Sequence, residues 1–171
     1  MPDGKCPVAI CGRVGVVGGK VGGGVVAVGV GVVSVGTTVW VGVVAVGVVC
    51  VAVVVVAAGS GTRLDAGAPK AFVGLGRHTI LRHALPGVFA SVPAQVVVVA
   101  PEGREGDALT GAWEAAGEHR DLVSVVTGGA TRQASVAAGL SAVWPDVEVV
   151  LVHDAARALV PPEVFGRVVD A

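Results

Sequence analysis

From Val51 onward, short apolar runs alternate along the chain with longer amphipathic segments. The apolar runs predict strands at residues 51–57, 95–100, 122–126 and 147–152. The amphipathic segments between and after them predict helices at residues 79–90, 103–118, 131–143 and 161–170. Strands that alternate with helices in this way are typical of a parallel sheet. We therefore expect an α/β fold, with a Rossmann-like, mostly parallel sheet flanked by helices.

Local signals refine these elements. The nearly continuous β-branched runs at 95–99 and 147–152 indicate strands that are covered on both faces. Thr79, Thr131 and the pair Pro161-Pro162 are suitable helix starts. Pro86 should kink or shorten the first of the four helices, because proline has no backbone N–H. We interpret the larger aromatic residues as core or helix-packing residues rather than a platform for base stacking: Phe89, Trp113, Trp144 and Phe165.

The first fifty residues differ sharply from the rest, since Val and Gly supply 32 of them. No charged residue occurs between Lys20 and Arg63, a stretch long enough to cross a bilayer. However, Val and Gly are poor helix formers, and the end of the stretch is itself a predicted strand. We therefore interpret residues 1–50 as a low-complexity extension of a domain at 51–171, with a membrane anchor or a structured subdomain as the alternatives.

The overall composition excludes several classes of function. A formal net charge of −1 argues against a nucleic-acid partner. The three cysteines and four histidines show no zinc-binding spacing, and the cysteines are too few for a disulfide framework. These features favour a reduced, cytoplasmic protein.

Residues 57–70, AAGSGTRLDAGAPK, directly follow the first predicted strand and have the character of a phosphate-binding loop. Glycines without a Cβ allow the backbone to approach an anion, and the N–H groups of small residues can converge on it. Arginine and lysine further along add two positive charges. The residues expected around a polyphosphate are Ala57, Ala58, Gly59, Ser60, Gly61, Arg63 and Lys70.

Two later segments also follow predicted strands, at residues 128–136 and 153–157. Ligands of open α/β sheets bind beyond the carboxyl ends of the strands, so the three segments should share one site. Asp154 is the candidate metal ligand there, because Mg²⁺ prefers one or two carboxylates together with phosphate oxygens. Alternatively, Asp154 caps the following turn or pairs with Arg157.

The segments AAGSGTRL…PK, GGATRQASV and VLVHDAAR together resemble the 2-C-methyl-D-erythritol 4-phosphate cytidylyltransferase family. The resemblance implies a fold like that of the nucleotide-diphospho-sugar transferases, Mg²⁺ or another divalent cation, and transfer of a cytidylyl group from CTP to a phosphorylated polyol. It assigns Arg63 and Lys70 to transition-state stabilisation, and Asp154 to the metal, with Arg157 orienting Asp154 or contacting phosphate. The nucleotide would be bound by the loop at 57–61 and by Gly129, Ala130, Arg132, Ser135 and Ala155. Two of these assignments stay open, since Ser135 could be a buried helix residue and Arg132 could be solvated. We take His153 as structural.

The chain also departs from the family pattern. Val56, Ala71 and Ala130 replace a proline, a glutamine and an acidic residue, at positions that we expect to contribute mainly backbone contacts. The family continues beyond the point that corresponds to Ala171, with a dimer-forming arm, a second metal carboxylate and basic residues for the acceptor. We therefore expect an incomplete enzyme, with the homodimer of the family in doubt.

Two other interpretations stand beside this one. The chain could be a nucleotidyltransferase that acts on another sugar or alditol phosphate with another base. It could also be a non-catalytic nucleotide-binding fragment or a membrane-tethered remnant.

Overall fold

The computed structural model describes residues 19–21, 24–35, 38–47, 49–59 and 68–171. The strands before residue 48 and the part of the chain from Cys50 onward belong to two separate compact units. None of the described helices is long and apolar enough to cross a membrane.

The first unit contains three antiparallel strands in the order β1-β2-β3: β1 (Gly19–Val21), β2 (Gly24–Val35) and β3 (Thr38–Gly47). The pairing of β2 with β3 runs from Val26 opposite Gly47 to Val35 opposite Thr38. Valine favours extended backbone, which accounts for strands in this valine-rich stretch. The domain boundary that we expect near residue 50 remains a proposal.

The second unit is built on four parallel strands in the order β8-β7-β4-β9: β4 (Val51–Val56), β7 (Gln95–Ala100), β8 (Val123–Thr127) and β9 (Val149–Asp154). All four strands predicted from the sequence are confirmed, with boundaries shifted by at most two residues. Their carboxyl ends lie at one edge of the sheet, where Val56 is opposite both Val99 and Asp154.

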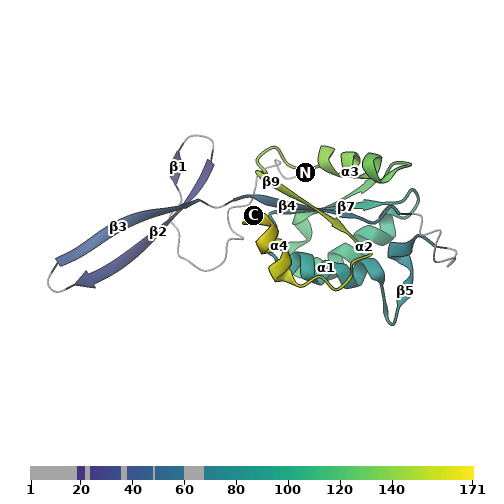
Figure 1. Ribbon diagram of the computed structural model, residues 1–171, viewed down its shortest axis with the longest axis horizontal. Coiled ribbons are helices and arrows are strands. Elements are labelled where there is room, and N and C mark those ends of the chain that lie inside the picture. The colour runs from purple at the N-terminus through teal and green to yellow at the C-terminus, as the bar shows by residue number, and fades with distance from the viewer. Residues whose placement is uncertain (1–18, 22–23, 36–37, 48, 60–67) are drawn as a thin grey trace. The chain divides into compact units, whose positions relative to one another are not determined.

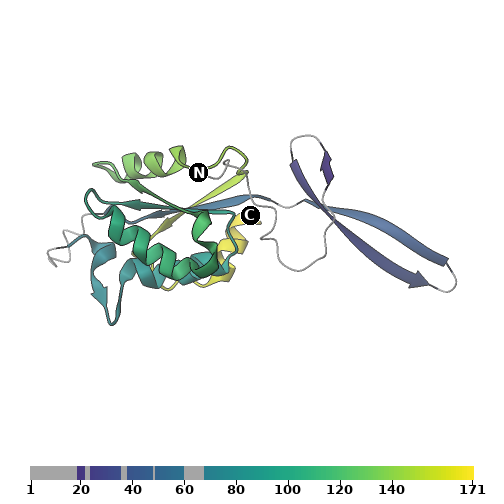
Figure 2. The same cartoon turned by 180° about the vertical axis from the view of Figure 1, so that it is seen from behind.

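Helices cover both faces of this sheet (Figures 1 and 2). One face carries α1 (Ile80–Ala90), α2 (Glu105–Ala116) and α4 (Pro162–Val169), and the other carries α3 (Arg132–Ser141). The structure also describes four short elements in this unit: η3 (Lys70–Phe72), β5 (Gly74–Leu75), β6 (His78–Thr79) and η4 (Gly117–Leu122). The predicted α/β fold, a parallel sheet flanked by helices, is therefore confirmed.

The core follows the alternation of side chains along β4. Val53 and Val55 pack among the buried residues of α1, α2 and α4, whereas Val54 joins Val97 and Val99 on the face that α3 covers. All six residues of β7 are buried, as the continuous apolar run predicted. Leu81, Leu85 and Val88 bury one side of α1 against the sheet.

The predicted start at Pro161-Pro162 is confirmed by α4, which begins at Pro162, and the two threonine starts are confirmed by side-chain caps. The Thr79 hydroxyl accepts a hydrogen bond from the Arg82 N–H at 3.2 Å, and the Thr131 hydroxyl accepts one from the Ala134 N–H at 3.0 Å. Pro86 does not shorten α1, which continues to Ala90. The helix tolerates the missing N–H because its apolar side is buried on the sheet, so tertiary packing overrides the local cost.

Three further expectations are wrong. β9 lies at the edge of the sheet and is not covered on both faces, since Val152 is 44% exposed. A continuous β-branched run signals a strand but does not fix its place in the sheet. Trp113 is an exposed residue of α2 rather than a core residue, because the small Ala112 and Ala116 occupy the buried side of that helix. Cys50 is disulfide-bonded, whereas the sequence led us to expect reduced cysteines.

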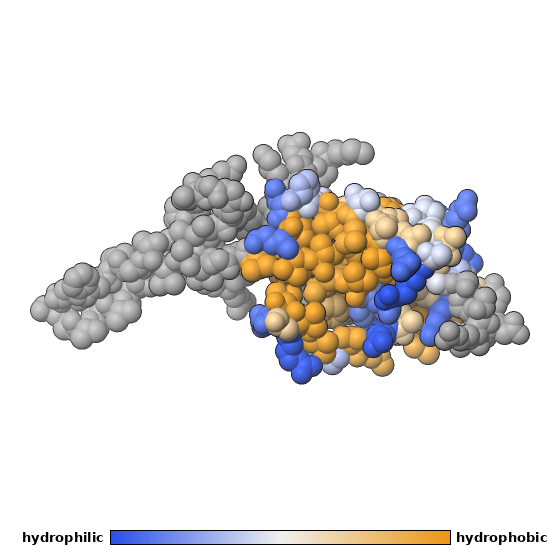
Figure 3. Space-filling view, turned by 45° about the horizontal axis from the view of Figure 1, so that its top comes forward, coloured by the Kyte–Doolittle hydropathy of each residue, from blue (hydrophilic) through white to orange (hydrophobic). Residues whose placement is uncertain are grey.

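Apolar side chains also reach the surface of the second unit. Figure 3 shows a broad apolar area on the face that it displays, bordered by hydrophilic residues. The exposed large apolar residues of this unit near its carboxyl-terminal elements are Val152, Leu159 and Val168.

Candidate functional site

A cavity of about 510 Å³ lies at the carboxyl ends of the strands, and we call it the strand-end cavity. Three segments that are far apart in the sequence form it: the end of β4 with η3, the start of α3, and the end of β9. Its lining residues are Val56, Ala57, Ala58, Gly59, Lys70, Ala71, Gly129, Ala130, Thr131, Arg132, Ser135, Asp154, Ala156 and Arg157.

Backbone hydrogen bonds hold the three segments together beyond the ends of the strands. The Ala57 N–H donates to the Val99 carbonyl oxygen at 2.8 Å, which extends the pairing of β4 with β7. The Gly128 N–H donates to the Ala100 carbonyl oxygen at 2.7 Å, and the Ala155 N–H donates to the Val56 carbonyl oxygen at 3.1 Å. The parallel sheet thus fixes the mutual positions of the three sequence motifs.

The turn before α3 requires glycine for steric reasons. A Cβ on Gly128 would lie 2.4 Å from the Ala58 Cβ and 2.9 Å from the Ser135 Oγ. A Cβ on Gly129 would lie 2.4 Å from the Ala134 Cβ. These separations are too short for carbon atoms, so the two glycines allow the turn to pack closely against the β4 loop and against α3.

Ser135 is buried, and its hydroxyl lies within hydrogen-bonding distance of two backbone carbonyl oxygens. The Oγ atom is 2.9 Å from the Thr131 oxygen and 3.2 Å from the Gly129 oxygen. Since a hydroxyl has one proton to donate, it bonds to one of these carbonyls at a time. Ser135 therefore ties the first turn of α3 to the Gly129 backbone, and its remaining lone pairs can still accept a hydrogen bond.

Of the residues that the structure describes, three cations and one carboxylate line the strand-end cavity. Lys70 is exposed on η3, and no described carboxylate pairs with it. Arg132, the first residue of α3, donates to the Asp154 Oδ1 from Nε at 3.3 Å and from a terminal nitrogen at 3.1 Å. The Arg157 Nε lies 4.0 Å from the other carboxylate oxygen. The excess of positive charge, beside the N-terminus of α3, suits a polyanionic ligand.

His153 points away from the strand-end cavity, toward α4. Its ring packs against the Phe165 ring, with centroids 5.3 Å apart. Burial lowers the pKa of His153, the Arg157 charge lowers it further, and the Asp154 charge acts in the opposite direction. The neutral imidazole packed against an aromatic ring agrees with a structural role.

The structure brings together ten residues that the sequence singled out. They all line the strand-end cavity: Ala57, Ala58, Gly59, Lys70, Gly129, Ala130, Arg132, Ser135, Asp154 and Arg157. Ala155 does not line it, because its side chain is buried in the core. Ser60, Gly61 and Arg63 lie outside the described residues.

Four lining residues were not predicted: Val56, Ala71, Thr131 and Ala156. Each is adjacent in the sequence to a predicted residue, so the sequence motifs were sufficient to indicate these positions as well. The sequence identified Thr131 only as a helix start, but the same position also makes it a lining residue of the cavity.

Among the described residues, Asp154 is the one carboxylate that lines the cavity, and no group of three or more metal-ligating side chains occurs there. A single carboxylate beside several cationic side chains fits a metal ion that receives its other ligands from a bound phosphate compound and from water. The donor set does not fit a cation held by protein side chains alone.

Comparison with known proteins identifies the family. The profile of the 2-C-methyl-D-erythritol 4-phosphate cytidylyltransferases (IspD) matches residues 51–171. The chain is 52% identical over 116 residues to the bifunctional enzyme IspD/IspF of Clavibacter michiganensis subsp. michiganensis, a match that covers 67% of this chain and 28% of that protein. It is 49% identical over 118 residues to the 2-C-methyl-D-erythritol 4-phosphate cytidylyltransferase of Streptomyces coelicolor, with 67% and 43% covered.

Solved structures show the same fold. The crystal structure of 4-diphosphocytidyl-2C-methyl-D-erythritol synthase from Anaerococcus prevotii superposes with a TM-score of 0.58 at 23% identity, over 71% of this chain and 50% of that chain. The chain spans less than half the length of the two curated relatives described above. The match over residues 51–171 shows that the chain belongs to the 2-C-methyl-D-erythritol 4-phosphate cytidylyltransferase family.

Proposed function

We propose that the strand-end cavity binds CTP and that the chain takes part in cytidylyl transfer to 2-C-methyl-D-erythritol 4-phosphate, a step of isoprenoid precursor synthesis. The observation that carries this proposal is the meeting of the three motif segments around one cavity with three cations and a carboxylate. Family membership supplies the choice of CTP and of the acceptor.

In the proposed reaction, a phosphate oxygen of the acceptor attacks the α-phosphorus of CTP. A new P–O bond forms, the bond from the α-phosphorus to the bridging oxygen breaks, and pyrophosphate leaves with that electron pair. The protein has to align the two phosphates and to neutralise charge on the transferring group. We assign this neutralisation to Lys70 and to Arg63, the latter outside the described residues.

The remaining residues position the nucleotide. The backbone at Ala57, Ala58 and Gly59 would face the triphosphate, together with Ser60 and Gly61 of the same loop. Gly129, Ala130 and Ser135 would face the pyrimidine, and a larger purine would meet the same wall sooner. We expect Ala155 to contribute only through its backbone, because its side chain is buried.

We assign a divalent cation, Mg²⁺ in the cell, to Asp154. The cation would neutralise charge on the phosphates when it is bound. Arg157 would orient the carboxylate from the side of Oδ2. A solved structure of Rv0371c from Mycobacterium tuberculosis, titled as a complex with manganese, has the same fold at 21% identity and supports the choice of a divalent cation. A cytoplasmic location and the homodimer of the family belong to the same proposal. Because Cys50 is disulfide-bonded, the location rests on family membership and not on reduced cysteines.

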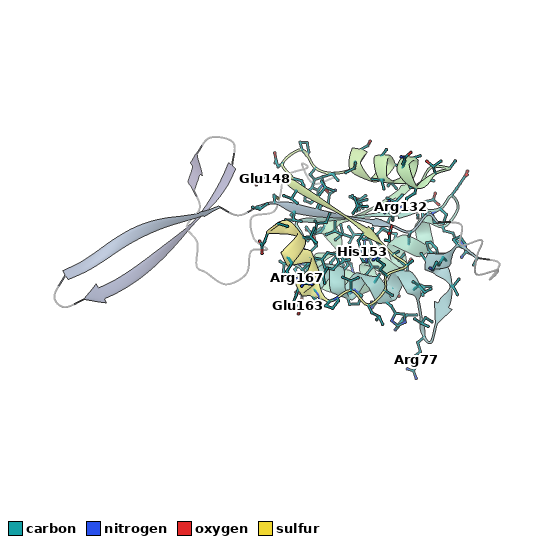
Figure 4. The ribbon with its side chains drawn as sticks, viewed as in Figure 1. Arg77, Arg132, Glu148, His153, Glu163 and Arg167 are labelled. Atoms are coloured by element: carbon teal, nitrogen blue, oxygen red, sulfur yellow. The ribbon has the colours of Figure 1, made fainter. Side chains whose placement is uncertain are left out.

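Calorimetric titration with CTP, UTP and GTP in the presence of Mg²⁺ tests nucleotide choice, and pyrophosphate release on addition of the acceptor tests turnover. We expect CTP to bind most tightly and Lys70→Ala to weaken binding. Arg77→Ala is the matched control, since Figure 4 shows Arg77 projecting from the β5–β6 hairpin, away from the labelled Arg132. Preference for UTP or GTP would contradict the proposal. CTP binding without turnover would leave a nucleotide-binding protein that is not an enzyme by itself.

A further inference from the structure

Arg132 and Asp154 form a direct contact across the strand-end cavity, although they are 22 residues apart in the sequence. Two nitrogens of the Arg132 guanidinium approach the same oxygen of the carboxylate, Oδ1, at 3.1 and 3.3 Å. The labelled Arg132 reaches from α3 toward the end of β9 in Figure 4. The guanidinium therefore occupies Oδ1 of Asp154, and both residues line the strand-end cavity.

The same carboxylate is the residue to which we assign the divalent cation. A carboxylate oxygen bonded to a guanidinium has lone pairs directed at that group, and a metal ion at the same oxygen would meet a like charge at short range. The two cations therefore compete for Asp154. Arg157 is less of a competitor, because its Nε lies 4.0 Å away and faces the other oxygen.

The side chain of Arg132 is free to leave Asp154, and a second binding partner would lie within the same cavity. Its side chain is 67% exposed, so the ion pair is screened by solvent and is easily broken. It lines the same cavity as Lys70 and Gly59, where the triphosphate would lie. Because Arg132 is the first residue of α3, a rotation of its side chain redirects the charge and leaves the helix in place.

We propose that Arg132 holds the cation position on Asp154 while the site is empty, and moves to the triphosphate when the metal and the nucleotide bind. This inference rests on the proposed function, since it needs Asp154 as the metal ligand. The exchange keeps the charge of the carboxylate balanced in the empty site. In the loaded site it delivers a guanidinium to the phosphates.

The first test is a Mn²⁺ titration of the nucleotide-free chain, read by water proton relaxation. Arg132→Gln should bind Mn²⁺ roughly two- to fivefold more tightly than the wild-type chain, the range expected when an exposed ion pair no longer competes. Arg157→Gln is the matched control, because it removes the same charge from the same cavity without vacating Oδ1. A gain in Arg157→Gln equal to that in Arg132→Gln would overturn the inference, as would unchanged affinity in Arg132→Gln.

Asp154→Asn separates failure of this inference from failure of the metal assignment. If Asp154→Asn abolishes Mn²⁺ binding while Arg132→Gln leaves it unchanged, Asp154 is the metal ligand and the competition does not exist. If Asp154→Asn has no effect on Mn²⁺ affinity, the metal assignment itself is wrong and the inference fails with it. Unchanged circular dichroism and melting temperature would confirm that each variant is folded.

The second test measures CTP binding with the metal removed by EDTA. Asp154→Asn should bind metal-free CTP roughly two- to fivefold more tightly, because Arg132 is then free for the triphosphate. In the double variant with Arg132→Gln this gain should disappear, which a general change in charge would not produce. An equal gain in both backgrounds would show that Arg132 does not carry the effect.

Discussion

Two hollows lie beside β9 and share Asp154 and Arg157, but the rest of their lining differs. The strand-end cavity is lined by three cations, a carboxylate, glycines and other small residues. The second hollow, of about 450 Å³, lies along the free edge of β9 and over α4, and we call it the edge hollow. Its lining residues are mostly apolar: Val150, Leu151, Val152, His153, Asp154, Arg157, Val160, Val164, Phe165 and Val168.

The difference between the hollows shows that one strand, β9, contributes to two different surfaces. At its carboxyl end, β9 presents Asp154 beside the loops that follow β4 and β8, and the tight glycine turn gives those loops their shape. Along its edge, the same strand presents consecutive residues of both faces to the hollow, because β4 is its one partner among the described strands. Substitutions in the strand-end cavity should therefore affect function or backbone packing, and those of exposed residues that line the edge hollow alone should have small effects.

The largest effect is expected from Lys70→Ala in the strand-end cavity. Loss of one cation that neutralises transition-state charge should lower kcat/KM for CTP by about 10²–10³-fold. The melting temperature should not change, because Lys70 is exposed and pairs with no described carboxylate. Steady-state pyrophosphate release and a thermal melt measure the two quantities. A comparable loss in Arg77→Ala would show that general charge, and not the site, is responsible.

Gly128→Ala is expected to have the next largest effect, on stability. The added Cβ would lie 2.4 Å from the Ala58 Cβ, so the turn or the β4 loop must shift, at a cost of about 1–3 kcal/mol in the free energy of unfolding. Gly166→Ala in α4, which borders the edge hollow, is the matched control, because a Cβ there meets no atom within 4 Å. It should be neutral or stabilise the helix by up to about 1 kcal/mol. If urea unfolding shows that both substitutions lower the free energy of unfolding, the comparison between the two hollows fails.

A smaller, pH-dependent effect is expected from His153 in the edge hollow. Burial lowers its pKa below the ordinary value of 6.5, so the unfolded chain binds the proton more readily than the folded chain. The contribution of His153 is therefore fully present above pH 6.5 and is lost as the pH falls through the lowered pKa. Urea midpoints measured between pH 8 and pH 4 should show this loss, and His153→Gln should reduce it. A loss of the same size in His153→Gln would contradict this prediction.

The smallest effect is expected from Val152→Thr, which places a hydroxyl on the 44% exposed edge of β9. Threonine keeps the β-branched shape, so the free energy of unfolding should change by no more than about 0.5 kcal/mol. The buried Val54, also a valine in a parallel strand, is the contrast, because Val54→Thr places a hydroxyl in the core and should cost about 1–3 kcal/mol. Equal costs at the two positions would mean that the edge of β9 is covered in solution.

Much of the fold and of the candidate site could be predicted because the signals are local. The valine runs are long enough to mark β4 and β7, and Thr79 and Thr131 start helices through hydrogen bonds to residues three positions later. The three motifs each follow a strand, which is sufficient to expect them at one edge of a parallel sheet. Trp113 was misjudged because the burial of an amphipathic helix depends on the face that meets the sheet.

The sequence by itself determined the helices, the strands and the residues that follow each strand, because these depend on neighbours within a few positions. The tertiary structure alone decided which strand lies at the edge, that Gly128 meets Ala58, and that Arg132 reaches Asp154. These contacts join segments separated by tens of residues. They depend on the order of strands in the sheet, and that order is fixed by the packing of the whole domain rather than by any local pattern.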